Sequence, residues 1–462
     1  MSKLKITLED LLLIPGAKIH NEHLFVPTSL VSIDSRNIEK GAIFFAIKGQ
    51  KFDGHDFIKE AVRKDAVAVV LNEDKINDLL SLNVTLIIVP DTTVALGELA
   101  KIWRNKLSAK VVALTGSNGK TTTKELIAHL LAQKFKVVKT EANNNNHIGV
   151  PLTIFSADDK TEVLVLELGT NHFGEIPYTA SIAQPDYALI TNIGDSHLEF
   201  FGNRENVYAE KSAIFEETIK RGGKIFVNYD DPIIKSKTKN LANKITYGFR
   251  GMTDYRGKIV SIGEFGETKI SIGYNNKKIE VSLPVYGKSN AENFLSAATV
   301  ALELGLNKTE IINAAKKLKP PEGRLNVKIK KKIVLIDDTY NANPDSVKAA
   351  VDLVERIKVY KKKILILGDM LELGEASPKL HEDLEIVIPN NKHYTVYTLG
   401  LMMKFLHNAL KNTEVYAKHF DFRTELIDEI NQSDFTESVI LVKGSRGMKM
   451  EDFVKILEEK YR

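Results

Sequence analysis

The chain has 462 residues, enough for two or three domains, and its hydrophobic fraction of 43% is ordinary for globular cores. The formal net charge of +4 is too small to indicate nucleic-acid binding, although a slight basic excess suits anionic small substrates such as nucleotides. The absence of cysteine excludes disulfides and thiol chemistry, and no apolar run has the length of a signal sequence or a membrane span, so we expect a cytoplasmic protein without membrane insertion.

Residues 1–91 predict a small α/β domain. Its strand-like apolar runs lie at 41–47, 66–71 and 86–89. The string Asp34-Ser35-Arg36 precedes the first of them and could bind a diphosphate or a sugar. A turn with a local ion pair is the commoner role of such a string, and from the residues alone we favour it.

A phosphate-binding pattern follows a predicted helix at 92–106. An apolar strand at 111–114 breaks into the turn Gly116-Ser-Asn-Gly119, and a helix begins at Lys120. The glycines let backbone N–H groups approach phosphates, Lys120 adds a charge, and the Thr121 hydroxyl can reach a magnesium ion. Leu114 stands where the common phosphate loop has its first glycine, so this loop is a variant, and an ordinary strand-to-helix turn is the alternative.

The remaining elements predict two further α/β domains. Strands at 163–168, 187–190 and 224–227 alternate with helices, which indicates a mostly parallel sheet, and 269–285 reads as a hairpin turning at Asn275-Asn276. A helix at 290–304 and a stiff connector at 320–323 end this part. A second α/β pattern then has strands at 333–336, 364–367, 396–399 and 439–442 and a closing helix at 450–459. We therefore predict domains at 1–91, 92–321 and 322–462.

Several polar residues stand where ligands bind in such sheets. Glu167 and His197 each follow a strand, and with Thr121 they form a plausible shell for a metal ion and phosphates. Lys211 lies on a predicted helix, and composition alone places it on a solvated face. The amides around Asn145 and Asn146 suit a polar, peptide-like ligand or a capped turn, and the sequence does not separate the two.

Together these motifs resemble the Mur ligases, the ATP-dependent amide ligases of bacterial cell-wall synthesis. The strings that carry the resemblance lie at 115–122, 286–293, 323–324 and 337–338, together with Glu167 and His197. Within the family, the chain is most similar to the members that add D-alanyl-D-alanine to a UDP-muramoyl tripeptide. The strings that point to those members lie at 145–153, 167–176, 337–346, 367–374 and 442–447.

The resemblance implies a fold and a set of binding residues. It implies a central phosphate-loop ATPase domain with a parallel sheet, flanked by a small N-terminal α/β domain for the UDP-sugar and a C-terminal Rossmann-like domain for the amino substrate. ATP would contact Thr115, Gly116, Ser117, Asn118, Gly119, Lys120, Thr121, Thr122, Asn290, Asn293, Arg324 and Asp338. Magnesium would bind at Thr121, Glu167, His197 and a carbamylated Lys211. Substrate contacts would come from Ser35, Arg36, Asn145, Asn146 and Asn343.

The implied reaction is stepwise. ATP phosphorylates the terminal carboxylate of UDP-N-acetylmuramoyl-tripeptide, and the amine of D-alanyl-D-alanine then displaces phosphate. Lys120, His197, Lys211 and Arg324 would be the catalytic residues. We expect a monomer that binds only small-molecule substrates, and a hinge at about 319–323 that closes the C-terminal domain over the nucleotide.

Two other functions stay open. One is a sibling ligase that adds a diamino acid to the dipeptide, although the Asp-Asn-Pro-Arg string of those members is absent. The other is a nucleotide-binding switch without ligase activity, although the chain has no Asn-Lys-x-Asp guanine-reading string. One departure from the family pattern is Tyr340, where some siblings carry Lys or His, so no phosphate-binding cation is predicted there.

Overall fold

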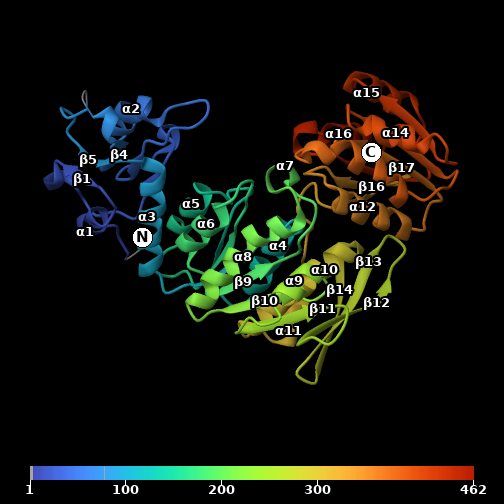
Figure 1. The fold of residues 1–462 in the computed structure, drawn as a ribbon, viewed down its shortest axis with the longest axis horizontal. Coiled ribbons are helices and arrows are strands. Elements are labelled where there is room, and N and C mark those ends of the chain that lie inside the picture. Colours follow the sequence, from blue (N-terminus) through green and yellow to red (C-terminus); the bar gives the residue numbers. More distant parts are fainter. Residues whose placement is uncertain (1–3, 77–78) are drawn as a thin grey trace. The chain divides into compact units, whose positions relative to one another are not determined.

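The computed structural model describes residues 4–76 and 79–462, which form two compact units (Figure 1). The first unit contains the chain up to Thr115, Lys134–Leu189 and Ser212–Ile225. The second contains Gly116–Gln133, Ile190–Lys211 and Phe226–Arg462. No helix among the described residues is both long enough and apolar enough to cross a membrane.

The N-terminal part of the first unit is a five-stranded sheet. Its strand order is β1-β5-β4-β3-β2, and only the β1–β5 pair is antiparallel. Its strands are β1 (Lys18–His20), β2 (Val31–Ser32), β3 (Ile43–Phe45), β4 (Ala68–Asn72) and β5 (Thr85–Val89). Its helices are α1 (Leu8–Leu12) and α2 (Ile58–Arg63), with short 3₁₀ helices at η1 (Glu22–Leu24), η2 (Ser35–Asn37), η3 (Gly54–Phe57) and η4 (Glu73–Lys75). The predicted strands at 41–47, 66–71 and 86–89 are confirmed.

The rest of the first unit carries the strand that leads to the predicted phosphate loop. The strand order is β9-β6-β8-β7, with β6, β8 and β7 parallel. Asp91 accepts hydrogen bonds from the N–H groups of Thr93 and Val94 at 2.7 and 2.9 Å, which explains why α3 begins at Thr92. The elements are α3 (Thr92–Lys106), β6 (Lys110–Thr115), β7 (Val137–Lys139), α5 (Gly149–Phe155), β8 (Val163–Glu167), α6 (Glu175–Ala183) and β9 (Tyr187–Ile190).

The second unit begins with the loop after β6 and the helix α4 (Lys120–Leu131). Strands β12, β13 and β14 form an antiparallel meander whose second turn is Asn275-Asn276, both with positive φ, as predicted. Other elements are α7 (Leu198–Phe201), α9 (Pro232–Lys237), β11 (Lys244–Gly248), β12 (Tyr255–Ile262), β13 (Glu267–Tyr274), β14 (Lys277–Tyr286), α10 (Gly287–Glu303) and α11 (Lys308–Ala315). Helix α8 (Arg204–Lys220) and strand β10 (Lys224–Asn228) carry the chain between the two units.

The C-terminal part of the second unit is a six-stranded sheet of the expected Rossmann-like type. Its order is β15-β16-β20-β17-β18-β19, and only β15 is antiparallel to its neighbour. The strands are β15 (Asn326–Ile329), β16 (Ile333–Asp338), β17 (Lys362–Gly368), β18 (Tyr394–Leu399), β19 (Tyr416–Phe420) and β20 (Ser438–Lys443). The helices are α12 (Pro344–Arg356), α13 (Ser377–Glu382), α14 (Met403–Leu410), α15 (Arg423–Gln432) and α16 (Glu451–Lys460), with η5 (Gly374–Ala376), η6 (Asp383–Val387) and η7 (Arg446–Met448).

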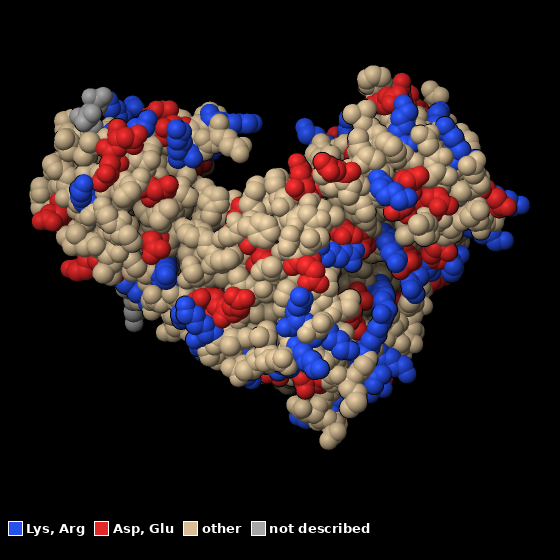
Figure 2. All heavy atoms as spheres, in the orientation of Figure 1, with Lys and Arg blue, Asp and Glu red and all other residues tan. Residues whose placement is uncertain are grey.

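Helices cover both faces of this sheet because successive strand residues point to opposite sides. Val334 and Ile336 pack into the core shared with α12 and α14, whereas Ile333 and Leu335 pack against α15 and α16. The Rossmann-like arrangement places the carboxyl ends of β16 and β20 at one edge, where ligands bind in such sheets. On the face of the molecule in Figure 2, Lys and Arg side chains are interspersed with Asp and Glu.

Candidate nucleotide site

The loop between β6 and α4 depends on two glycines. Gly116 has a φ of 148°, and a Cβ there would lie 1.9 Å from the Thr191 hydroxyl oxygen. Gly119 has a φ of 78°, and a Cβ there would lie 2.4 Å from the Asn293 amide oxygen. Side chains at both positions are therefore excluded by conformation and by space, which keeps the loop backbone accessible to phosphates.

Lys120 and Arg324 approach this loop from different elements. The Lys120 amine donates to the carbonyl oxygens of Gly116 at 2.7 Å and Ser117 at 3.3 Å. Arg324 donates to the Thr121 hydroxyl at 3.0 Å, and its guanidinium lies 3.9 Å from the Tyr340 ring centroid. Tyr340 is therefore an aromatic platform for Arg324, a role that does not require a cation at position 340.

Asn118 links the loop to two other segments. Its N–H donates to the Asn192 side chain at 2.9 Å, and its carbonyl accepts from the Thr191 hydroxyl at 2.6 Å. Its side-chain oxygen accepts from Asn343 at 2.8 Å. Because Asn343 also caps α12 through Ser346 N–H at 2.9 Å, the start of that helix is fixed against the loop.

His197 is held by an acidic residue that the sequence analysis did not single out. Its Nδ1 lies 2.7 Å from a Glu372 carboxylate oxygen, and both residues have positive φ, 53° and 62°. The close approach of His197 is the main cause that lowers the pKa of Glu372, against the opposing effect of burial. A carboxylate on Nδ1 fixes the orientation of an imidazole, as it does around many metal-bound histidines.

Lys211 corrects an expectation drawn from composition alone, which placed it on a solvated face. The side chain is on α8 and only 1% of the residue is exposed. An ammonium buried to this degree carries a desolvation cost that a solvated lysine does not.

Asp338 is engaged in a buried ion pair at the end of β16. One carboxylate oxygen accepts from the Lys443 amine, and the other accepts from the Leu325 N–H at 3.0 Å. Lys443 also donates to the Asn341 carbonyl at 2.9 Å. In this structure, Asp338 therefore orders the segment after Arg324.

A second feature beside α4 is a small cavity of about 180 Å³, lined from α4, α10 and the connector before Arg324. Asn290 and Thr122, both predicted nucleotide residues, line it, and so do His129, Pro320 and Pro321. Asn290 donates to the Tyr286 carbonyl at 2.8 Å, and Asn293 accepts from the Thr123 hydroxyl at 3.3 Å. The cavity is lined by both polar and apolar residues.

Four predicted site residues lie in the central part of the first unit. Glu167 ends β8, is 2% exposed, and accepts from the Asn145 amide at 3.0 Å. Asn146 uses its side-chain oxygen to accept from the Ile148 and Gly149 N–H groups at 3.1 and 2.8 Å, which is the capped-turn alternative. Thr115, the last residue of β6, has a buried hydroxyl without a hydrogen-bond partner among the described residues.

The two predicted UDP-sugar residues lie in the 3₁₀ helix η2. Arg36 pairs with Asp34 at 2.9 Å, which holds the pKa of Asp34 down at about 2, and Ser35 donates to Glu60 at 2.9 Å. The ion pair between Asp34 and Arg36, which we favoured from the residues alone, is therefore present. The Arg36 side chain remains exposed.

The donor set suits magnesium better than a transition metal. In residues 4–76 and 79–462, no three His, Asp or Glu side chains converge as a metal cluster. Magnesium usually binds one or two protein oxygens plus substrate phosphates and water, so a cluster is not required. Thr121, hydrogen-bonded to Arg324 beside the glycine loop, and the buried Glu167 carboxylate each offer the oxygen ligands that the ion prefers.

Four residues of the site had no role predicted from the sequence, namely Glu372, Asn192, Lys443 and Tyr340. Glu372 and Lys443 lie within motif strings that were noted, at 367–374 and 442–447, so the signal was present. Their partners are far away in sequence, and a spacing rule reaches only neighbours along one helix or strand.

Family models match three consecutive parts of the chain. The Mur ligase family catalytic domain matches residues 27–104, the Mur ligase middle domain 114–301, and the Mur ligase glutamate ligase domain 323–446. The chain belongs to the Mur ligase family, and the expected three-domain α/β fold is confirmed. The exact boundaries at 91/92 and 321/322 stay predictions.

Individual relatives are similar over nearly their whole length. The UDP-N-acetylmuramoyl-tripeptide–D-alanyl-D-alanine ligases of Bacillus subtilis and Haemophilus influenzae are 36% and 35% identical, over 93% and 95% of both chains. A MurF crystal structure from Acinetobacter baumannii superposes with a TM-score of 0.88 at 30% identity, covering 98% of this chain and 99% of that one. The structure of the Thermotoga maritima MurF ligase in complex with ADP superposes with a TM-score of 0.83 at 30% identity, covering 94% of this chain and 97% of that one.

Proposed function

We propose that the protein is an ATP-dependent ligase that joins D-alanyl-D-alanine to UDP-N-acetylmuramoyl-tripeptide in peptidoglycan precursor synthesis. The similarity to ligases of that name, over 93% or more of both chains, carries the proposal. The glycine loop with Lys120 and Arg324 supplies the parts for phosphoryl transfer. The ADP bound to the Thermotoga maritima relative supports ATP as the nucleotide.

The loop and its two cations position the nucleotide for transfer. The backbone N–H groups of the glycine loop cradle the phosphates, and Lys120 exchanges its loop carbonyls for phosphate oxygens. Arg324, braced on Tyr340, neutralises charge that develops on the transferred group. The base occupies the cavity lined by Asn290 and Thr122.

Two chemical steps follow. The tripeptide carboxylate attacks the γ-phosphorus, which gives an acyl phosphate and ADP. The amine of D-alanyl-D-alanine then attacks the acyl carbon and an amide bond forms. Phosphate leaves with the electrons of the broken C–O bond and takes up the proton that the amine loses. A free carboxylate is a poor acylating agent at neutral pH, which is why ATP is consumed. The protein mainly positions reactants and stabilises charge.

Magnesium would be held by Thr121, Glu167 and His197, and at a second position by Lys211 in carbamylated form. When bound, the ion neutralises phosphate charge during transfer. Glu372 orients the His197 ring for this role. Carbamylation would replace the buried ammonium of Lys211 with a carboxylate-like oxygen ligand, which suits both its burial and a divalent cation.

The residues proposed to bind the two organic substrates lie before and after the nucleotide loop in the sequence. Ser35 and Arg36 are proposed for the UDP-sugar, since the exposed Arg36 guanidinium suits a diphosphate. Asn145, Asn146 and Asn343 offer amide donors and acceptors for the peptide parts. A cytoplasmic location and a monomeric state complete the proposal, in keeping with a nucleotide-linked precursor as substrate.

A substrate panel tests the proposal directly. UDP-N-acetylmuramoyl dipeptide and tripeptides with lysine or diaminopimelate are each combined with D-alanyl-D-alanine, lysine or diaminopimelate, and ATP consumption and product mass are measured. We expect product only from a tripeptide with D-alanyl-D-alanine. Product from the dipeptide with a diamino acid would instead establish the sibling activity.

A further inference from the structure

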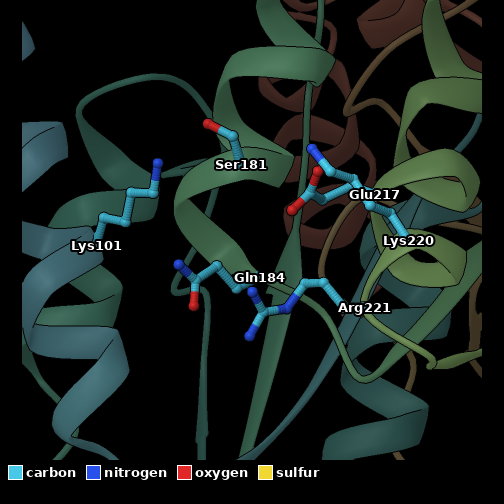
Figure 3. A pocket seen from close by; sticks show the side chains of 6 residues that line it. All are labelled: Lys101, Ser181, Gln184, Glu217, Lys220 and Arg221. Carbon is cyan, nitrogen blue, oxygen red and sulfur yellow. The ribbon is translucent and has the colours of Figure 1, made fainter.

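A polar cavity of about 530 Å³ lies in the first unit, away from every residue assigned to nucleotide or substrate (Figure 3). Its lining side chains come from α3, from α6 and the residue after it, and from the end of α8 and the residue after it, namely Lys101, Ser181, Gln184, Glu217, Lys220 and Arg221. Helices α6 and α8 lead into the N-terminal ends of β9 and β10, whereas the nucleotide loop follows the C-terminal end of β6. The cavity therefore belongs to the edge of the strands opposite to the one that carries catalysis in such sheets.

The cavity concentrates positive charge. Within residues 4–76 and 79–462, Lys101, Lys220 and Arg221 form no ion pair. Glu217 precedes Lys220 by three positions and Arg221 by four, which is pairing distance on a helix, yet it pairs with neither. Three unpaired cations against one carboxylate leave a net positive site.

A buried guanidinium lies behind the cavity and is paired with an acidic residue. Arg104 donates to the carbonyl oxygens of Ala183 at 3.2 Å and Gln184 at 3.4 Å, and it pairs with Asp186 at 3.2 Å. Burial lowers the pKa of Arg104, and the charge of Arg221 lowers it further, while Asp186 acts in the opposite direction. Two like charges close enough to affect each other favour an anion beside them.

Gln184 adds an unmet hydrogen-bonding need. It follows the last residue of α6 with a φ of 47°, and only 5% of it is exposed. Its buried Oε1 has no hydrogen-bond partner among the described residues. Figure 3 shows its side chain among those that line the cavity. An unpaired buried amide oxygen is costly, so a ligand here gains by donating a hydrogen to it.

We propose that this cavity is a binding site for inorganic phosphate. The anionic oxygens accept hydrogen bonds from Lys101, Lys220 and Arg221, and a P–OH group donates to the Gln184 oxygen or to Glu217. Inorganic phosphate keeps at least one P–OH group at neutral pH. A phosphate monoester has lost most of its protons there, because its second pKa is about 6. Sulfate, with a similar size and shape, has none and would place bare oxygens against two acceptors.

Calorimetric titration with the nucleotide site saturated by magnesium and ADP separates this site from the phosphate loop. We expect wild-type protein to bind inorganic phosphate at least about tenfold more tightly than sulfate or glycerol phosphate. Equal affinity for phosphate and sulfate would contradict the role of the P–OH group. Tighter binding of glycerol phosphate would overturn inorganic phosphate as the ligand and assign the site to a monoester.

Two variants and a control localise the binding. The exposed pair Lys220→Ser and Arg221→Ser should weaken phosphate binding about tenfold or more, whereas the equally charged, exposed pair Lys331→Ser and Lys332→Ser should leave it unchanged. Glu217→Gln replaces an anionic acceptor with a neutral amide that also donates, so sulfate should bind more tightly to this variant than to the wild type. Phosphate binding that survives the Lys220/Arg221 change, or a sulfate affinity that does not rise after Glu217→Gln, would overturn the proposal. Neither measurement depends on ligase activity.

Discussion

At the scale of single residues, Lys120 shows how this site is prepared for a nucleotide. Its amine rests on the carbonyl oxygens of Gly116 and Ser117, which satisfies the charge in the same loop that is proposed to hold the phosphates. The Lys120 amine can then exchange these carbonyl oxygens for phosphate oxygens by rotation of its side chain alone. The backbone of the loop, fixed by its two glycines, does not have to move.

Lys120→Ala should therefore remove turnover without unfolding the protein. We expect the rate of ADP formation to fall by about 10²–10³-fold, because one preorganised charge at the transferred phosphate is lost. Lys239→Ala, which removes an exposed lysine elsewhere in the second unit, is the control and should keep wild-type rate. Near wild-type ligation by Lys120→Ala would refute the assignment of the loop to ATP.

Lys211 offers a test that does not rely on rate alone. If the side chain is carbamylated, protein incubated with ¹³C-bicarbonate should show a carbamate carbon signal by NMR, and Lys211→Ala should lack it. Lys211→Ala should also be nearly inactive and partly rescued by acetate or another short carboxylate, which restores oxygen ligands. Absence of the signal in active wild-type protein, or full activity of the variant, would count against carbamylation.

At the scale of secondary-structure elements, the strands and helices with strong apolar periodicity could be predicted from the sequence. Helix α3 matches its predicted span of 92–106. Strands β16 and β17 contain their predicted spans, because a strand that is buried on both faces is a continuous apolar run in the sequence. The edge strands β15 and β19 were missed. Each has one buried residue, and its other residues are partly buried or exposed, so the apolar signal is weak.

The candidate site likewise has a part that could be predicted from the sequence and a part that could not. The glycine loop could be predicted because its chemistry is contiguous in sequence. The contacts of His197 with Glu372 and of Asn118 with Asn343 could not, because they join different domains. The burial of Lys211 also escaped prediction, since a 17-residue helix with a mixed composition does not reveal which of its charged residues faces the core.

Strand β17 carries a buried lysine that predicts a pH dependence. Burial lowers the pKa of Lys363 to about 8, opposed by Glu355, and the amine donates to the Ile357 carbonyl. An unfolded lysine titrates near 10.4, so between about pH 8 and 10 the unfolded state binds more protons than the folded state. Stability from this group therefore rises with pH across that window and is reduced below it.

Lys363→Met should cancel this dependence. Calorimetry of the unfolding transition of the C-terminal domain at pH 8, 9 and 10 gives the free energy of unfolding of the variant minus that of the wild type. This difference should become less favourable to the variant by roughly 1 kcal/mol per pH unit. Other titrating groups are common to both proteins and cancel. A difference independent of pH would show that Lys363 keeps an ordinary pKa.

At the scale of the molecule, the connector before Arg324 is proposed as a hinge. Within the second unit, Arg324–Thr121 and Asn343–Asn118 join the C-terminal domain to the nucleotide loop across residues 319–323, which lie outside helices and strands. Contacts of this kind stabilise a closed state, and ligands shift the population toward it only if they bind it more tightly than an open state.

Small-angle scattering tests this hinge. A non-hydrolysable ATP analogue with UDP-N-acetylmuramoyl-tripeptide should lower the radius of gyration relative to the ligand-free protein. Asn343→Ala, which removes one of the joining contacts, should reduce that change. An unchanged radius under saturating ligands, when the ligand-free protein is open, would argue against a hinge at the connector.

The central claim is that the protein activates a carboxylate by phosphorylation, and isotope transfer measures this most directly. UDP-N-acetylmuramoyl-tripeptide labelled with ¹⁸O in its terminal carboxylate is incubated with ATP, magnesium and D-alanyl-D-alanine, and the released phosphate is analysed by mass spectrometry. We expect one ¹⁸O atom in each phosphate and formation of the pentapeptide product. Unlabelled phosphate, or ATP turnover that does not require the dipeptide, would contradict the account.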